Sequence, residues 1–239
     1  MIDRFTPKDL YSVQKPGRYI GREYGGILKE NYDVSFLSVY PDLYEVGISY
    51  FGLNIFHFMI NDIPWAYHDY AFVPAPDMER LMREKRVPLY GLQSYRPAYD
   101  FDVISFHVLA EMNFTNILLF LDLSGIPMLA SERKDEKWPI IVAGGPSISN
   151  PEPMADFLDV VFIGDGEVSI PPFLNIVRQA KLSGKNKSWI IEKVHDKIAS
   201  AYVPSRYRHE YRGLEVIKLD VSLLNRLELQ GIKYTLLEK

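Results

Sequence analysis

Five short apolar runs, four of them followed by a segment of helical character, constrain the fold of this 239-residue chain more than any other feature. The runs occupy residues 34–40, 66–74, 101–109, 139–143 and 159–163. The first is apolar almost throughout and stops at Pro41, as expected of a strand that is buried on both faces. After it, Leu53, Phe56 and Ile60 recur at helical spacing. Strands that alternate with helices predict βαβ units and a parallel sheet.

Crossovers between parallel strands are right-handed, which leaves few topologies for such a chain. We therefore predict an α/β fold with a five-stranded, parallel, flavodoxin-like, doubly wound sheet. Ligands of such sheets bind outside the carboxyl ends of the strands. The segments that leave those ends are residues 41–47, 74–77, 107–111, 144–146 and 164–167.

The alternation of predicted strands and helices also indicates how the chain divides into an arm, a domain and an appendage. Residues 1–30 are glycine-rich and charged without a clear period, and we expect an N-terminal arm there. The flavodoxin-like domain is predicted over residues 31–184. A small α+β appendage follows over residues 185–239, with a helix at 188–198 and strands at 201–204 and 214–219.

Composition excludes several classes of chemistry. The chain has no cysteine, so it holds no disulfide, thiolate metal site or cysteine-ligated iron–sulfur cluster. Five histidines without a His-x-x-x-His pair predict no metal site, and no catalytic triad is legible. The formal net charge of -4 carries no basic signal for nucleic acid. No apolar run is long enough to span a bilayer and the start has no signal-peptide core, so we expect a soluble, cytoplasmic protein.

Two glycine clusters stand where predicted strands end. Gly144 and Gly145 follow the fourth strand, and residues 164–167 follow the fifth with the sequence Gly164, Asp165, Gly166, Glu167. Glycine accepts positive φ and carries no side chain, so a large planar ring could lie against such a strand mouth. The acidic residues repel a bare phosphate, which argues against a P-loop or a dinucleotide fingerprint. A tight strand-to-helix turn is the alternative interpretation of each cluster.

Polar residues also follow the first and third predicted strands. Asp42, Tyr44, Gly47 and Ser49 cluster after the first strand, where a ligand would bind or where a capped loop would form. His107 and Glu111 stand at the exit of the third strand, and a lone histidine there is more often structural than functional.

Several short motifs occur in order along the chain. They are KPGRYIG at 15–21, PDLYEVGIS at 41–49 with GL at 52–53, Glu111 with TN at 115–116, GGP at 144–146 with NPEP at 150–153, IGDGE at 163–167 and YVP at 202–204. Together they resemble the N-terminal domain of radical SAM proteins, in particular an uncharacterised branch in which this domain has a cobalamin-binding-like fold. The resemblance extends to about residue 220.

The resemblance implies a cofactor site at the carboxyl ends of the strands. A corrin ring would lie against Gly144, Gly145 and residues 164–167, with the polar residues after the first and third strands beside it. The Asp-x-His-x-x-Gly signature of base-off cobalamin proteins reads Asp-Leu-Tyr-Glu-Val-Gly at residues 42–47, so no imidazole can ligate cobalt from that position. Cobalamin binding without a histidine ligand stays compatible with the resemblance.

The three-cysteine motif that holds the radical SAM cluster is missing. We therefore expect no catalysis by this chain alone, and a radical SAM core, on the same polypeptide or on a separate chain, as its partner. Residues 185–239 would lead toward that core. The alternative is a protein-interaction module with a vestigial ligand site, whose face is the aromatic segment 65–72 or the N-terminal arm. A free-standing enzyme that uses a diffusible nucleotide would need a phosphate-cradling loop, which the sequence lacks.

Overall fold

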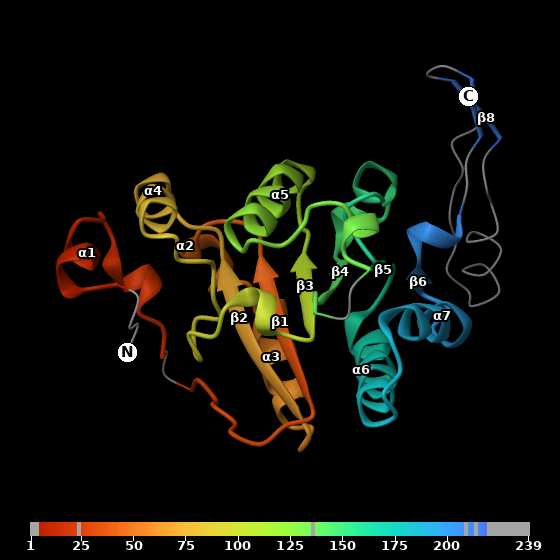
Figure 1. The fold of residues 1–239 in the computed structure, drawn as a ribbon, viewed down its shortest axis with the longest axis horizontal. Coiled ribbons are helices and arrows are strands. Elements are labelled where there is room, and N and C mark those ends of the chain that lie inside the picture. Colours follow the sequence, from red (N-terminus) through yellow and green to blue (C-terminus); the bar gives the residue numbers. More distant parts are fainter. Residues whose placement is uncertain (1–4, 23–24, 135–136, 208–209, 213–214, 219–239) are drawn as a thin grey trace.

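A six-stranded sheet forms the centre of the molecule (Figure 1). The computed structural model describes residues 5–22, 25–134, 137–207, 210–212 and 215–218. The strands lie in the order β2-β1-β3-β4-β5-β6. Their bounds are Val34–Tyr40 (β1), Ala66–Phe72 (β2), Val103–His107 (β3), Ile140–Gly144 (β4), Val160–Phe162 (β5) and Ala201–Tyr202 (β6). Strands β1 to β5 are parallel, which confirms the predicted flavodoxin-like order, and β6 adds an antiparallel edge.

Helices cover both faces of the sheet. The longer ones are Phe51–Asn61 (α3), Pro76–Lys85 (α4), Phe114–Leu123 (α5), Gly166–Leu182 (α6) and Lys187–Lys197 (α7). Buried side chains of α4 and α5 pack on one face of the sheet, and those of α6 and α7 pack on the other together with Ile60 of α3. Because both faces are covered, all seven residues of β1 are buried, which accounts for its continuous apolar sequence.

Short helical segments connect these elements. They are Pro7–Tyr11 (α1), Pro16–Tyr19 (η1), Tyr44–Gly47 (α2), Ala98–Asp100 (η2), Glu111–Asn113 (η3), Ala130–Glu132 (η4), Pro146–Ile148 (η5), Glu152–Met154 (η6) and Pro204–Arg206 (η7). None of the helices in the described ranges is both long enough and apolar enough to cross a membrane.

The sheet continues into the segment predicted as an appendage. Val161 of β5 pairs with Tyr202 of β6, and α7 is anchored by the ammonium of Lys187, which lies 2.8 Å from the carboxylate of Asp159. A separate antiparallel pair follows, made of Glu210–Arg212 (β7) and Glu215–Lys218 (β8). The predicted strand at 214–219 overlaps β8, while residues 214 and 219 lie outside the described ranges.

The N-terminal arm packs beside β2 and α4, as Figure 1 shows. The backbone N–H of Gln14 donates to the carboxylate of Asp77 at 2.8 Å, and the hydroxyl of Tyr90 donates to the carbonyl of Tyr19 at 3.0 Å. Residues 66–72 of the aromatic segment 65–72, which was one candidate for an interaction face, form the strand β2 and are all buried. Trp65 is partly buried, and the guanidinium of Arg178 lies 4.7 Å from the centroid of its ring.

Candidate functional site

The sequence-predicted site residues all lie at one edge of the sheet, where the parallel strands end. Tyr40 pairs with Phe72 at the last position of β1 and β2, and His107 pairs with Gly144 at the last position of β3 and β4. The loops and helix starts that follow these strands carry the remaining predicted residues, so the parallel topology brings four separate segments together. We call this the carboxyl edge.

Local packing occupies most polar groups of the loop after β1. The carboxylate of Asp42 accepts from the N–H of Leu43 at 2.7 Å, and the hydroxyl of Ser49 donates to the carbonyl of Val46 at 3.2 Å. Tyr44 meets Phe72 edge to face, with ring centroids 5.3 Å apart. A Cβ on Gly47 would lie 2.4 Å from the Phe72 ring, so this glycine allows α2 to approach the sheet. Asp42, Tyr44, Gly47 and Ser49 thus shape the loop.

The N-terminal arm holds this loop by charge. The ammonium of Lys15 lies 2.8 Å from Glu45 Oε1, and the guanidinium of Arg18 lies 2.7 Å from the same oxygen. Hydrogen bonds from Arg18 and then Lys15 lower the pKa of Glu45 to about 2. The KPGR and DLYEVG motifs are both visible in the sequence, but the contact between them is not, because they lie far apart along the chain.

Two asparagines join the loop after β3 to the loop after β1. The side-chain amides of Asn113 and Asn116 both donate to the carbonyl of Pro41, at 3.1 Å and 2.9 Å. His107 is buried beneath the rings of Phe56 and Tyr50, and burial lowers its pKa to about 4. Glu111 starts the η3 turn and is exposed. The two predicted residues therefore differ, since His107 is structural and neutral while Glu111 faces solvent.

The glycines of the two clusters have different roles. Gly145 has φ of 120°, and a Cβ there would lie 2.5 Å from the carbonyl oxygen of Val108. A Cβ on Gly166 would lie 2.5 Å from the Phe56 ring. Gly144 has room, because the nearest atom to its Cβ position is the Phe162 carbonyl oxygen at 3.6 Å. Packing against backbone therefore requires glycine at Gly145. At Gly166 a Cβ would meet the outer end of the Phe56 ring, which would have to shift, and at Gly144 a Cβ meets no close atom.

A cavity of about 340 Å³ opens beside the fifth strand. Gly164, with φ of 119°, and Asp165 line one side of it, and residues 197–200 line the other. Within it the hydroxyls of Ser169 and Ser200 lie 2.8 Å apart. Asp165 and Glu167 are exposed at the start of α6. The lining of this cavity is mixed, with Ile163, Val168 and Ile198 beside the two serines, and the cavity lies at the β5 end of the carboxyl edge.

Large apolar side chains stand exposed on the segments that leave the strands. Val46 and Phe51, which follow β1, are 46% and 72% exposed. Met112 follows β3 and is 79% exposed, and Val168 follows β5 and is 73% exposed. Exposed apolar groups that recur at one edge mark an interaction surface more than scattered ones do. These four residues were not predicted from the sequence, because their positions follow no periodic pattern.

A chain of buried histidines runs beneath this edge. His107 Nε2 lies 3.1 Å from the hydroxyl of Ser38, which lies 2.8 Å from His68 Nε2. On the far side of that ring, His68 Nδ1 lies 3.3 Å from Nδ1 of His57, and the amide of Asn61 lies 3.4 Å from the same atom.

One direction of donation satisfies the whole chain. An amide nitrogen only donates, so His57 Nδ1 is an acceptor and His68 Nδ1 carries a proton. His68 Nε2 then accepts from Ser38, whose oxygen accepts from His107 Nε2. All three imidazoles are neutral, and burial lowers the pKa of each. From the sequence His107 was interpreted as a lone histidine, because the strand pairing that joins it to His68 is not visible in the sequence.

The described residues offer no metal site: no three His, Cys, Asp or Glu side chains lie close enough together to hold an ion. The fold and this edge define the class of protein as a doubly wound α/β domain with bare glycine turns and apolar side chains where its strands end. The family model of radical SAM proteins, N-terminal, matches residues 52–204, which is more than half of the chain. The chain therefore belongs to the radical SAM proteins, as their N-terminal domain.

The match includes GL at 52–53 and the motifs from residue 111 to residue 204, while those at 15–21 and 41–49 lie before it. Comparison with curated proteins and with solved structures finds no match. The chain has no cysteine, so the cluster of a radical SAM enzyme is not bound by its residues.

Proposed function

We propose that this chain is a non-catalytic domain whose carboxyl edge docks on a radical SAM core, located on the same polypeptide or on a separate chain. Membership in the N-terminal family implies such a core as partner. The observation that carries the proposal is the set of exposed apolar side chains at this edge, namely Val46, Phe51, Met112 and Val168. Burial of such groups against a partner stabilises a complex by roughly 25 cal/mol per Å² of apolar area.

The surroundings of these side chains support a protein partner. The centres of interfaces are apolar and their rims are polar. Glu111, Asp165 and Glu167 are exposed beside the apolar residues. The loops that carry them are braced by Asn113 and Asn116 on Pro41 and by Arg18 on Glu45, so the edge is ordered before it docks. A pre-ordered surface loses less conformational entropy on binding.

Binding of cobalamin at the same edge is a narrower prediction. The contacts there argue against a corrin whose cobalt is ligated by a side chain of this protein. Tyr44 packs on Phe72, and His107 is buried with its Nε2 against Ser38. Gly145 and Gly166 are packed against their own chain, which leaves Gly144 and the cavity beside Gly164 as open positions. The residues therefore favour docking over a stacked corrin.

Replacement of the apolar edge tests the docking function. In the full-length polypeptide, or in a mixture with the separately encoded core, a Phe51→Ser, Met112→Ser, Val168→Ser variant should lose hydrogen-exchange protection at the edge or dissociate from the core. Leu182→Ser is the matched control, since Leu182 is 67% exposed at the opposite end of α6. A folded triple variant that binds the core as tightly as the wild type would refute the docking function.

Gel filtration after incubation with hydroxocobalamin tests the narrower prediction. We expect the protein peak to carry no cobalamin absorbance, under either reducing or oxidising conditions. Retained absorbance that disappears in a Gly144→Phe variant would instead establish a corrin site at this edge.

A further inference from the structure

A second cavity lies at the opposite edge of the sheet, where the strands begin. Its volume is about 750 Å³, within the range of small-molecule sites. The segments that line it precede β3 and β4 or follow α4 and α5. Nothing in the proposed docking function uses this edge, so the cavity is an independent feature of the fold.

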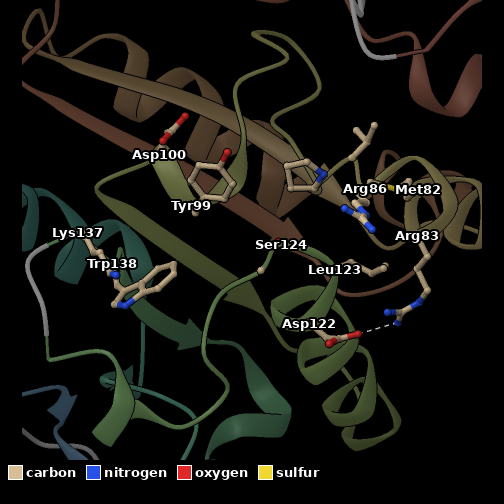
Figure 2. A pocket seen from close by; sticks show the side chains of 13 residues that line it. Met82, Arg83, Arg86, Tyr99, Asp100, Asp122, Leu123, Ser124, Lys137 and Trp138 are labelled. Atoms are coloured by element: carbon tan, nitrogen blue, oxygen red, sulfur yellow. Dashed lines mark ion pairs between the residues drawn. The ribbon is translucent and has the colours of Figure 1, made fainter.

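Aromatic side chains form one wall of the cavity. Figure 2 shows Tyr99 and Trp138 on one side and Arg86 on the other, with Ser124 between them. Tyr99 and Trp138 are only partly buried, and the ammonium of Lys137 lies 4.9 Å from the centroid of the Trp138 ring, so one face of that ring already carries a cation. Flat rings of this kind bind other planar rings by stacking.

Besides Lys137, the cationic side chains that line the cavity are Arg83 and Arg86. Arg83 is neutralised by Asp122 at 2.7 Å, as the dashed line in Figure 2 shows. Arg86 makes no ion pair or hydrogen bond through its side chain among the described residues. Its backbone is left-handed, with φ of 54°, at the C-cap of α4, where glycine is the usual residue. An arginine kept at a strained position, with its guanidinium free beside a cavity, is suited to bind an anion.

The base of the cavity contains an unsatisfied hydroxyl. Ser124 is fully buried, and its Oγ has no hydrogen-bond partner in the part of the chain that the structure describes. Most buried hydroxyls are paired, and because this oxygen has almost no surface open to the cavity, a ligand would satisfy it only if the Ser124 side chain rotated toward the cavity. It is an observation independent of the charge and the rings.

We propose that this cavity binds a planar heteroaromatic anion of the size of a nucleoside monophosphate. The ring would stack on Tyr99 or Trp138, and the anionic group would pair with Arg86. Asp100, which also lines the cavity, accepts hydrogen bonds from sugar hydroxyls or ring amines and disfavours a second anionic group. This ligand site is separate from the carboxyl edge.

Calorimetry of the full chain with AMP tests the proposal. AMP should bind in the micromolar to submillimolar range, while adenosine, which lacks the anion, and ribose 5-phosphate, which lacks the ring, should each bind at least about 10-fold more weakly. Equal affinity for AMP and ribose 5-phosphate would reduce the site to a non-specific anion contact and overturn the proposal.

Variants locate the binding on the protein. Arg86→Gly removes the guanidinium but suits the left-handed backbone, so it should weaken AMP binding about 10-fold or more while the melting temperature rises. Trp138→Leu should weaken AMP and adenosine binding alike. Arg80→Gln on the exposed surface of α4 is the control and should bind as the wild type does. The proposal fails if AMP produces no saturable heat up to 1 mM, or if Arg86→Gly binds AMP as tightly as the wild type does.

Discussion

The guanidinium of Arg18 lies 2.7 Å from the carboxylate of Glu45 and thereby ties the N-terminal arm to the loop that leaves β1. Lys15 reaches the same oxygen, so two cations of one short motif hold one acid of another. This contact joins a segment outside the family match to the edge that we propose as the docking face.

Glu45→Gln should release the arm with little loss of global stability. Exposed ion pairs contribute roughly 0.2–1 kcal/mol each, so the free energy of unfolding should fall by less than about 2 kcal/mol. Proteolysis near residues 15–20 should become faster. Because the folded pKa of Glu45 lies below its ordinary value, the contribution is present above the unfolded pKa near 4.5 and is lost as pH falls toward about 2. Unchanged proteolysis of the variant would contradict this role of the ion pair.

Ser38→Ala should destabilise the fold more than a surface serine would. Its hydroxyl stands between two buried imidazoles, at 2.8 Å from His68 and 3.1 Å from His107. Each buried group that loses its partner costs about 1–3 kcal/mol, so urea unfolding should show a loss of roughly 2–4 kcal/mol. Ser105→Ala is the matched control: Ser105 is buried on β3, and its hydroxyl makes no hydrogen bond among the described residues. Equal losses in the two variants would argue against the histidine chain.

The histidine chain should make the fold sensitive to acid. Burial lowers the pKa of His107 from 6.5 to about 4, so the unfolded state binds protons more readily. Its share of stability is therefore complete above pH 6.5 and is lost as pH falls from 6.5 toward 4. The loss amounts to about 3 kcal/mol for this group. The groups packed against it are Phe56, Tyr50 and Ser38.

Urea midpoints at pH 8, 6.5 and 5 measure this dependence. A His107→Gln variant should lose part of the pH dependence, whereas His195→Gln on the surface of α7 should keep it. A wild-type urea midpoint that stays constant between pH 8 and pH 5 would contradict the predicted sensitivity to acid.

The two adjacent glycines after β4 should respond differently to alanine. Gly145→Ala forces a Cβ to within 2.5 Å of the Val108 carbonyl oxygen at φ of 120°, and should cost roughly 2–4 kcal/mol of stability. Gly144→Ala meets no atom nearer than 3.6 Å and should cost less than about 1 kcal/mol. Thermal unfolding of the pair compares them directly, and similar melting temperatures would contradict the packing argument.

Arg86→Gly should stabilise the isolated fold. A non-glycine residue in the left-handed region costs about 1 kcal/mol, and Arg86 has φ of 54°. The free energy of unfolding should rise by about that amount in urea titrations. A loss of stability would mean that the arginine side chain makes a stabilising contact that outweighs the backbone strain.

Much of the fold could be predicted from local pattern. The apolar run that became β1 and the helical spacing of Leu53, Phe56 and Ile60 depend on neighbours in the chain, and the strand order follows from a handedness rule. The edge at which the predicted site residues meet was also predictable, because the carboxyl ends of parallel strands lie at the same edge of a sheet. The sixth strand was missed as part of the sheet because its two residues, Ala201 and Tyr202, carry no period of their own.

The roles of individual site residues could not be predicted in this way. Gly144 and Gly145 are identical neighbours in sequence, yet only the second meets another loop, because the carbonyl of Val108 belongs to the segment that follows β3. His57, His68 and His107 are far apart in the chain and become one hydrogen-bonded chain only when β1, β2, β3 and α3 pack together.

By itself the sequence determined the class of fold, the edge where the predicted site residues gather and the absence of a cysteine-bound cluster in this chain, since these depend on periodicity, chain direction and composition. Only the tertiary structure decided which glycines are sterically required, which histidines are buried and neutral, and which apolar side chains remain exposed. Those properties depend on contacts between atoms from distant segments, and the free energy of such contacts is set by distance and burial in three dimensions.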